Sequence, residues 1–399
     1  MDDRVRFNAL GYAFHLYSGK DALEHLPREL ARAGATRALL VCGRSVAAHT
    51  NLVERVRALI GDKLAGVYSG IQKDAPLDNV LAAVQAAREQ RADLLIAVGA
   101  GSVLKAVRII AILLAETQPL DQLITQYPPG GRAISPKLTA PKLPIINVLT
   151  APTTAQNRAG AALKEGEGTR GQRMEFFDPK TRPCAIFWDA DALLTAPPKL
   201  ALHTGAAIYW RSLMNMGLAS TANPLVQGER YQAYRLASGA IRRVCDSSNA
   251  EPRIELCAAA FLQNREEDEG RRLSQSHWVA RVVYALGAST FHLCEHVGQG
   301  EAYAALTASA VRQFGVRDPD AIAAIGEALG ASANIDDVAA AFERVYAELG
   351  LATRLRDVGV PQDMLPAILQ HSLQNFNADA QREFLAETES LAKVLDAAW

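Results

Sequence analysis

The first part of the chain alternates short apolar runs with stretches in which apolar residues recur at helical spacing. Four runs predict strands, at 37–43, 64–70, 93–102 and 143–155. Two intervening stretches predict amphipathic helices, at 51–61 and 76–92, the second with proline at its start. Strands that alternate with helices form parallel sheets, so we predict an α/β domain over residues 1–190.

The second half of the chain, from about residue 191, keeps only the helical period. Clear helical patterns cover 198–216, 232–245, 253–263 and 276–289. We therefore predict an all-α domain over residues 191–399. The Pro- and Gly-rich stretch 126–142 predicts a loop, and the charge cluster 263–272 predicts a solvated helix end.

Composition narrows the class of protein. Of 399 residues, 49% are hydrophobic and 21% are charged, and the formal net charge is -1. This balance gives no overall field for nucleic acid or an anionic membrane, and the apolar runs near 109–115 are too short to cross a bilayer. The polar start is unlike a secretory signal, and five scattered cysteines suit neither a disulfide framework nor a zinc knuckle. We expect a cytoplasmic protein with a small-molecule partner.

A glycine turn follows the predicted strand 93–102 and opens a helix. Helix N-termini present free N–H groups and a positive dipole end, which suit a phosphate. The turn lacks the GxGxxG spacing of the Rossmann fingerprint. Thr153 and Thr154 follow another predicted strand, and the carboxyl ends of parallel strands meet at one edge of a sheet. Together the two turns predict a nucleotide site.

Several motifs in order along the chain resemble the iron-containing alcohol dehydrogenase superfamily, particularly its maleylacetate reductase branch. They include "ADLLIAVGAGS", "LPIINVLTAPTTA" and "WDADALLTAPPKLALHTG". The resemblance covers nearly the whole chain. It implies the dehydroquinate synthase-like, iron-type alcohol dehydrogenase fold, a dinucleotide-binding N-terminal domain, an active site in the interdomain cleft, and a homodimer. It further implies that the cofactor pyrophosphate lies against Gly99, Ala100, Gly101 and Ser102, with Thr153 and Thr154 nearby.

Cofactor preference depends on the stretch "CGRS" after the first predicted strand. In many NAD-preferring members of the family, an acidic residue in this region contacts the ribose. This chain has no carboxylate there, and Arg44 can pair with a 2'-phosphate. NAD or NADP therefore remains open, with NADPH slightly favoured. The alternative is that Arg44 is an ordinary surface residue.

The resemblance breaks at the metal ligands. The family's Asp and His, four residues apart on one helix face, correspond to Ala207 and Arg211. A later histidine-bearing helix has Ala280 and Tyr284, and the last ligand falls on Glu295 or His296. One surviving ligand does not hold Zn²⁺ or Fe²⁺, so we predict no catalytic metal.

The loop after the threonines also departs from the family. Gln156, Asn157, Arg158 and Ala159 replace small residues that pass close to the nicotinamide in the family. Their bulk predicts a reshaped or blocked nicotinamide pocket. Whether this loop still admits a nicotinamide stays open.

Charged and polar residues at these positions suggest a replacement for the metal. Arg211 and Arg158 would place positive charge on opposite walls of the cleft, which suits an anionic substrate. Tyr284 can donate a proton or simply pack as an aromatic ring, and a histidine can act near neutral pH. The predicted catalytic residues are Arg211, Tyr284, Glu295 and His296, and the predicted substrate contacts are Asn157, Arg158 and His292.

The leading functional hypothesis is a metal-independent NAD(P)H-dependent reductase of a small anionic or unsaturated carbonyl compound. One alternative is a non-redox enzyme of the lyase or cyclase type on the same scaffold. A second is a non-catalytic pseudo-dehydrogenase. The physiological substrate is left open.

Overall fold

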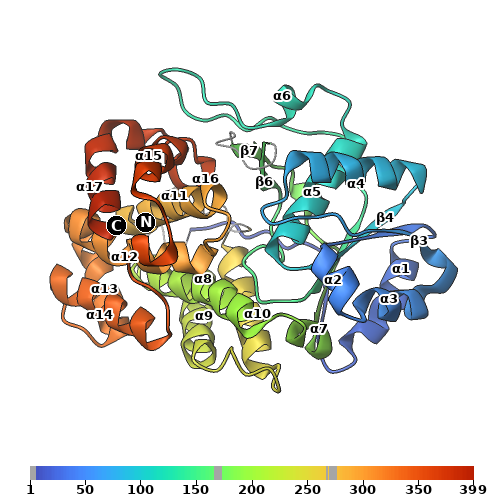
Figure 1. The fold of residues 1–399 in the computed structure, drawn as a ribbon, viewed down its shortest axis with the longest axis horizontal. Helices are drawn as coiled ribbons and strands as arrows, with labels where there is room; N and C mark the ends of the chain where they lie inside the picture. Colours follow the sequence, from blue (N-terminus) through green and yellow to red (C-terminus); the bar gives the residue numbers. More distant parts are fainter. Residues whose placement is uncertain (1–5, 166–172, 267, 269–275) are drawn as a thin grey trace.

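A computed structural model describes residues 6–165, 173–266, 268 and 276–399. The chain forms two lobes side by side (Figure 1). One lobe holds the first part of the chain around a parallel sheet, and the other is built from helices. The predicted fold class is confirmed.

The sheet of the α/β lobe has six parallel strands in the order β1-β8-β5-β4-β2-β3. The strands are β1 (His15–Gly19), β2 (Ala38–Cys42), β3 (Leu64–Tyr68), β4 (Leu94–Gly99), β5 (Ile145–Leu149) and β8 (Ala185–Asp189). Four of them lie within the predicted runs, whereas β1 and β8 were not predicted. In the register of the sheet, Gly99 lies opposite Leu149, so the turns after β4 and β5 begin at the same edge.

Helices cover both faces of the sheet. Alternate residues divide between two cores: Leu40 and Ile96 face the core beneath α1 (Leu26–Arg32) and α3 (Leu52–Ile60). Val41 and Ala97 face the core formed with α4 (Leu77–Glu89) and α5 (Gly101–Ala115). The lobe also contains three short helices, α2 (Arg44–His49), α6 (Leu120–Leu123) and α7 (Ala190–Leu194). Burial of both faces explains why the central strands read as continuous apolar runs.

A two-stranded antiparallel hairpin, β6 (Ala161–Lys164) and β7 (Arg173–Phe176), interrupts the α/β pattern. It was not predicted. The hairpin contacts α5 and lies between the lobes (Figure 1). The stretch 126–142 is irregular apart from one bridge between Gln126 and Ile134, in agreement with the predicted loop.

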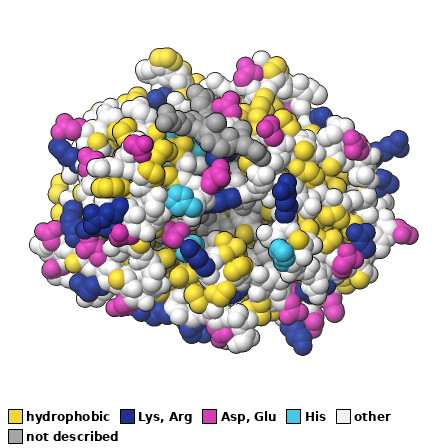
Figure 2. All heavy atoms as spheres, in the orientation of Figure 1, with side chains coloured by type: hydrophobic (Ala, Val, Ile, Leu, Met, Phe, Trp, Pro, Cys, Tyr) yellow, Lys and Arg dark blue, Asp and Glu magenta, His cyan; other side chains and the backbone are white. Residues whose placement is uncertain are grey.

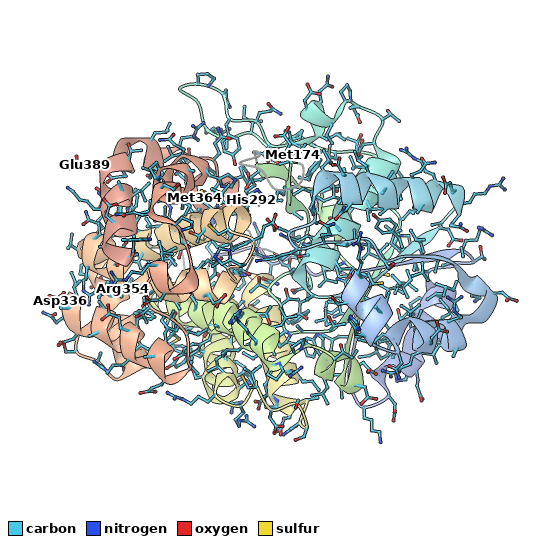
Figure 3. The ribbon with its side chains drawn as sticks, in the orientation of Figure 1. Met174, His292, Asp336, Arg354, Met364 and Glu389 are labelled. Atoms are coloured by element: carbon cyan, nitrogen blue, oxygen red, sulfur yellow. The ribbon has the colours of Figure 1, made fainter. Side chains whose placement is uncertain are left out.

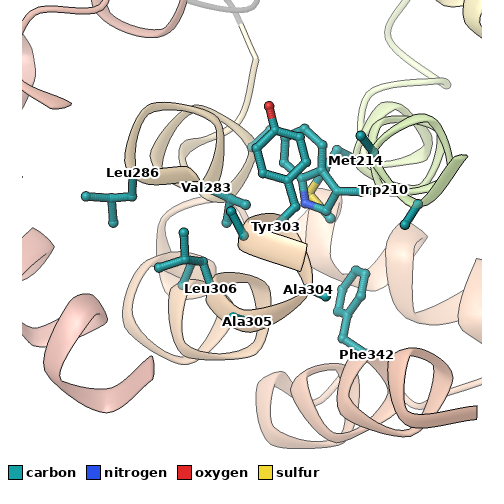
Figure 4. Packing of buried hydrophobic residues seen from close by; sticks show 14 of the residues in the cluster. Trp210, Met214, Val283, Leu286, Tyr303, Ala304, Ala305, Leu306 and Phe342 are labelled. Atoms are coloured by element: carbon teal, nitrogen blue, oxygen red, sulfur yellow. The ribbon is translucent and has the colours of Figure 1, made fainter. Parts of the chain in front are cut away.

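The helical lobe packs helices of different lengths around one large core. They are α8 (Pro198–Met216), α9 (Pro224–Ile241), α10 (Glu251–Arg265), α11 (Trp278–Leu293), α12 (Gln299–Phe314), α13 (Pro319–Leu329), α14 (Ile335–Glu348), α15 (Leu365–Ser372), α16 (Phe376–Asp379) and α17 (Thr388–Ala398). In Figure 4 the ring of Tyr303 on α12 lies against Trp210 on α8, with ring centroids 4.2 Å apart. Gly287 on α11 permits this arrangement, because a Cβ there would lie 2.5 Å from the Tyr303 ring. These contacts fix α8, α11 and α12 close together.

The charge cluster 263–272 is not simply a solvated helix end, so that prediction is corrected for its first residues. Gln263 and Asn264 are buried on α10, and buried Glu266 forms an ion pair with Arg230 at 2.6 Å. Their hydrogen bonds to neighbouring helices and loops compensate the burial of these polar groups. Positions 267 and 269–272 lie outside the described residues. Across the described chain, no helix has both the length and the apolar character needed to cross a membrane.

Candidate active site

The turn after β4 has the backbone geometry of a phosphate site. The first residue of α5 is Gly101, and Ala100 before it makes no side-chain capping bond, so the first amides of the helix face outward uncapped. A Cβ on Gly101 would lie 3.2 Å from Oγ1 of Thr153, and one on Gly99 would lie 2.6 Å from Val103. The turn thus stays narrow and free of side chains, which fits a dinucleotide pyrophosphate.

The hydroxyl groups around this turn are already engaged. Oγ1 of buried Thr153 accepts a hydrogen bond from the Ala155 amide at 3.1 Å. The Ser102 hydroxyl accepts one from the Asp74 amide at 2.9 Å. The carbonyl oxygen of Thr154 accepts one from Asn264. These bonds hold the rim of the turn in place. Both hydroxyls act as acceptors in them, so their O–H groups remain available as donors beside the helix amides.

Arg44 begins α2, directly after β2, and its side chain is exposed. Because β2 and β4 are neighbouring parallel strands, Arg44 lies at the same edge of the sheet as the glycine turn. Its position is compatible with contact to the distal ribose of a dinucleotide.

The loop after the threonines turns the side chains of Gln156 and Asn157 toward α10. Gln156 is fully buried, and its amide donates to the Cys257 carbonyl oxygen at 2.6 Å and accepts from Trp188 at 2.7 Å. Asn157 donates to the Phe261 carbonyl oxygen at 3.3 Å. Both side chains point toward α10 and fasten the loop to it. The bulk of Gln156 is therefore accommodated in the protein interior.

Asn264 of α10 joins the loop to two arginines. Its Oδ1 accepts from Arg158 Nε at 3.2 Å and from Arg211 Nη1 at 2.7 Å. Its Nδ2 donates to Asn157 Oδ1 at 2.6 Å and to the Thr154 carbonyl oxygen at 2.9 Å. Asn264 is only 1% exposed, and its side chain thus makes all four of the hydrogen bonds available to an amide. Asn264 therefore fixes the two guanidinium groups relative to each other.

Tyr284 of α11 is hydrogen-bonded to Arg158 across the cleft. Burial raises the pKa of the Tyr284 phenol, but the charges of Arg158 and Arg173 and the bond to Arg158 outweigh it, and the net pKa is lowered. The Tyr284 ring lies 6.4 Å from Tyr303, whose hydroxyl accepts from Gln299 at 2.8 Å. A phenol with a lowered pKa can supply a proton, and the two guanidinium groups beside it stabilise the phenolate that remains.

The residues at the positions predicted for metal ligands do not form a suitable donor set. Ala207 and Ala280 are buried and carry no ligand atom. Gly300 at the start of α12 packs against α8 next to Ala207, which brings Gln299 to this wall. Arg211, Tyr284 and Gln299 offer a cation, a phenol and an amide, and these do not fit a divalent transition metal. Within the described ranges, no three His, Cys, Asp or Glu side chains gather in a way that could hold one.

Glu295 and His296 lie at the rim. Glu295 has a side chain that is 67% exposed and pairs with Lys164 at 2.7 Å. His296 is exposed, and its Nε2 contacts the Gly359 carbonyl oxygen at 3.1 Å. Asn264 thus brings Arg158 and Arg211 together, and Arg158 links them to Tyr284, whereas Glu295 and His296 have other partners at the surface.

His292 belongs to a second cluster between the lobes. Its Nδ1 lies 2.5 Å from Oδ2 of Asp74, which also pairs with Lys105 of α5. Burial raises the pKa of Asp74, but the charge of Lys105 and the contact with His292 outweigh it and hold the carboxyl well below its usual range. The His371 ring of α15 lies 4.8 Å from His292. Figure 3 shows His292 on the side of the helical lobe that faces the α/β lobe, and Figure 2 shows a hollow between the lobes bordered by histidine, basic and acidic side chains.

Sequence reasoning missed several residues of this cleft, chiefly Asp74, Arg173, Asn264, Gln299 and His371. One of them carried a usable signal. Asn264 continues the stripe of Cys257 and Phe261 at helical spacing on α10, and all three face the loop 154–157. A polar residue on an otherwise buried helix face indicates a specific partner. For Asp74 and Arg173 no such pattern exists, because only the fold brings them to the cleft.

Comparison with known proteins places these features in context. The family profile described as Iron-containing alcohol dehydrogenase matches residues 14–190. Alcohol dehydrogenase 4 of Schizosaccharomyces pombe is 24% identical over 374 residues, which are 91% of this chain and 82% of the relative. Maleylacetate reductase 2 of Cupriavidus pinatubonensis is 27% identical over 261 residues, 65% of this chain and 63% of the relative.

A solved structure supports the same fold. The sulfoacetaldehyde reductase from Bifidobacterium kashiwanohense, crystallised in complex with NAD+, superposes with a TM-score of 0.75 at 15% identity. The match covers 97% of each chain. At this identity the likeness concerns the fold.

Proposed function

We propose that this chain belongs to the iron-containing alcohol dehydrogenase superfamily and is a metal-independent NAD(P)H-dependent reductase of a small anionic or unsaturated carbonyl compound. Its relatives are named as dehydrogenases and reductases, and the chain is an oxidoreductase by that kinship. The substrate class and the independence from metal are the new elements of the proposal.

The observation that carries the proposal is the group formed by Arg158, Arg211 and Tyr284 around Asn264. A metal in this superfamily would polarise the carbonyl oxygen of the substrate. Two guanidinium groups fixed by one buried amide offer positive charge without a metal, and they need no reorganisation during the reaction. Arginine stays charged at any relevant pH and suits carboxylate and oxyanion geometry.

The cofactor would lie along the edge of the sheet. When bound, a reduced nicotinamide dinucleotide supplies the hydride. The amides at the start of α5 bind its pyrophosphate, Gly101 and Thr153 keep the approach narrow, and Arg44 pairs with a 2'-phosphate where one is present. Gln156 and Asn157 leave the approach to the nicotinamide open, because their side chains are fastened to α10.

The proton for the reduced product would come from Tyr284. The positive charges of Arg158 and Arg173 lower the pKa of its phenol, which makes it a better acid than a free tyrosine. Arg211 and Arg158 stabilise the negative charge that develops on the substrate oxygen. Asn157 fastens the loop that carries Arg158 to α10, and His292 contributes to the substrate-binding surface.

Metal independence is supported by the chemistry of the residues at the expected ligand positions. Two are alanines and one is an arginine, whose positive charge repels a divalent cation at close range. A decayed site would more often retain small neutral residues than a guanidinium group in a fixed hydrogen-bond arrangement. This favours a replaced function over a lost one.

The test is a titration of chelator-treated protein with NADH and NADPH, followed by nicotinamide fluorescence, and then turnover with a panel of oxo acids, quinones and unsaturated acids. We expect binding of at least one cofactor and oxidation in the presence of a member of the panel, without added metal. Absence of cofactor binding would refute the reductase hypothesis. Cofactor binding without any turnover would favour the pseudo-dehydrogenase, and turnover of an oxo acid without cofactor oxidation would favour a lyase or cyclase. One tightly bound transition metal per chain would overturn the metal-independent mechanism.

A further inference from the structure

Three nitrogen atoms between the lobes are buried and have no hydrogen-bond partner in the described chain. They are Nη1 of Arg173, Nε2 of His292 and Nε2 of His371. The Arg173 side chain is 10% exposed and the His292 side chain is 4% exposed. A buried polar atom without a partner costs free energy, so native proteins seldom retain one without a ligand or water to meet it. Three in one place therefore call for a common explanation.

The two imidazole rings are each anchored through the other nitrogen. Nδ1 of His292 donates to the carboxylate of Asp74 at 2.5 Å. Nδ1 of His371 lies 2.9 Å from the Ser289 hydroxyl, which itself donates to the Ala285 carbonyl oxygen and so accepts from the ring. The ring centroids are 4.8 Å apart. Both Nε2 atoms are consequently the free ends of fixed rings.

Arg173 approaches the same place from the hairpin strand β7. Its Nη2 pairs with Glu175 at 3.3 Å, which leaves Nη1 without a partner. The charge of Arg173 lowers the pKa of both His371 and Tyr284, so its guanidinium group lies near these two side chains. The three free nitrogens thus come from β7, α11 and α15, elements that are distant in sequence.

The charges around the three nitrogens are balanced before any ligand arrives. Asp74 is paired with Lys105, and Glu175 is paired with Arg173. The charged and titratable groups that face His371 are His292, Arg173 and Asp74. Burial and the nearby positive groups lower the pKa of His371 to about 3, so this ring is neutral at pH 7. An anion placed here would reverse that effect and favour a proton on the imidazole pair.

We propose that Arg173, His292 and His371 form an oxyanion subsite between the lobes, which takes the second anionic group of the substrate together with one proton. An oxyanion with two or more oxygens can accept from Nη1 of Arg173 and from a protonated Nε2 at once. The incoming negative charge is balanced by the proton. The subsite rests on the proposed function, because its ligand is part of the substrate that the reductase would reduce, and its oxyanion is a carboxylate or a phosphate group.

The experiment is isothermal titration calorimetry of the whole protein, without cofactor, using malonate and inorganic phosphate as separate probes. Titrations at pH 6, 7 and 8 in two buffers with different ionisation enthalpies count the protons taken up. We expect one oxyanion per chain, uptake of about one proton, and an affinity that falls about tenfold for each unit of rising pH. Tighter binding of malonate identifies a carboxylate as the natural group, and tighter binding of phosphate identifies a phosphate.

Three variants remove the free nitrogens one at a time. His292→Asn and His371→Asn keep an amide donor near the place of Nδ1 and lose Nε2, and Arg173→Gln loses Nη1. Each is expected to weaken oxyanion binding at least about tenfold, the size expected for loss of one charged hydrogen bond. His49→Asn, on exposed His49 of α2, serves as the matched control and should bind as the native protein does.

The proposal is overturned if neither probe binds, if binding takes up no proton, or if the three variants bind as tightly as the control. Circular dichroism and thermal melting identify any variant that fails to fold, and Arg173→Gln then carries the test alone. A parallel titration with NADPH separates this inference from the proposed function. If the native protein binds the oxyanion but not NADPH, the reductase is refuted and the subsite stands. If it binds NADPH but not the oxyanion, only the subsite is refuted.

Discussion

The two walls of the cleft are built in different ways. On the α/β wall, the turn from Gly99 to Ser102 presents backbone amides at the start of α5. On the helical wall, Arg211 of α8 is held by Asn264 of α10, and Tyr284 of α11 is hydrogen-bonded to Arg158. The first wall depends on one local strand–turn–helix unit, and the second on how separate helices cross. A backbone site can keep its function while its sequence changes, but a side-chain site changes its chemistry with each substitution.

Hydrogen bonding sharpens this difference. The amides at the start of α5 have no capping side chain, so they are available to a ligand. Asn264 on the other wall has all four of its hydrogen bonds made within the protein. The α/β wall therefore has free donors for an anion. On the helical wall, the hydrogen bonds of Asn264 are used to hold the two arginines in place.

Gly101→Asp is expected to have the largest effect. A carboxylate on the first residue of α5 would repel the pyrophosphate, although an acidic residue is favourable for the helix itself. We expect NAD(P)H affinity to fall about 100-fold or more, or about 2.7 kcal/mol, in a fluorescence titration. Gly228→Asp on α9, where a side chain meets open space, is the control and should bind normally. Equal affinity in the two variants would show that the turn does not hold the cofactor.

Tyr284→Phe tests the helical wall while leaving the α/β wall intact. Loss of a general acid is expected to lower kcat about 100-fold, with unchanged NAD(P)H affinity. In the native protein the phenol must be protonated to act, so kcat should fall as the pH rises through its lowered pKa, below the usual value of 10. This fall of kcat at alkaline pH should be absent from the pH profile of Tyr284→Phe. The measurement is a pH profile of kcat from steady-state kinetics.

The matched control for this variant is Tyr209→Phe, which removes a phenol that is buried in the helical core. It should keep both its rate and its alkaline limb. If Tyr284→Phe also keeps them, Tyr284 is a packing residue and another group supplies the proton.

The α/β wall was also the part that the sequence predicted best. The strands at 93–102 and 143–155 were visible because both faces of the sheet are buried, and the turn between Gly99 and Ser102 follows from them. The hairpin with β7 escaped prediction because its two strands have only four residues each. Arg173 and Asp74 reach the cleft through tertiary contacts that leave no local pattern. The sequence predicted Glu295 or His296 as the last ligand, but Gly300 is the residue of this segment that packs against α8, and Glu295 and His296 are exposed.

Asn264→Ala is expected to have an intermediate effect, because it removes the hydrogen bonds that connect the loop 154–157 with Arg158 and Arg211. The change leaves the Thr154 carbonyl oxygen and the Asn157 side chain without a donor, which costs about 2 kcal/mol. We expect kcat/KM to fall about 30-fold, less than loss of the acid itself, with a fall of several degrees in Tm. Calorimetry and steady-state kinetics measure the two effects.

Asn51→Ala is the control for that variant, because Asn51 is exposed and makes no capping bond. It should change neither Tm nor kcat/KM. A variant at Asn264 that loses stability but retains full kcat/KM would mean that the arginines hold their positions without it.

Arg44→Glu is expected to have the smallest effect and bears on the α/β wall alone. Arg44 is exposed at the first turn of α2, so its pairing with a 2'-phosphate is screened by water, and a glutamate there is tolerated by the helix. We expect KM for NADPH to rise about tenfold relative to KM for NADH, with kcat unchanged, because only the ground-state contact to the phosphate changes. Arg28→Glu, on exposed Arg28 of α1, should leave that ratio as it is. If the ratio of KM for NADPH to KM for NADH is unchanged in Arg44→Glu, Arg44 does not discriminate between the two cofactors. The contacts of the α/β wall with the cofactor would then come from its backbone amides.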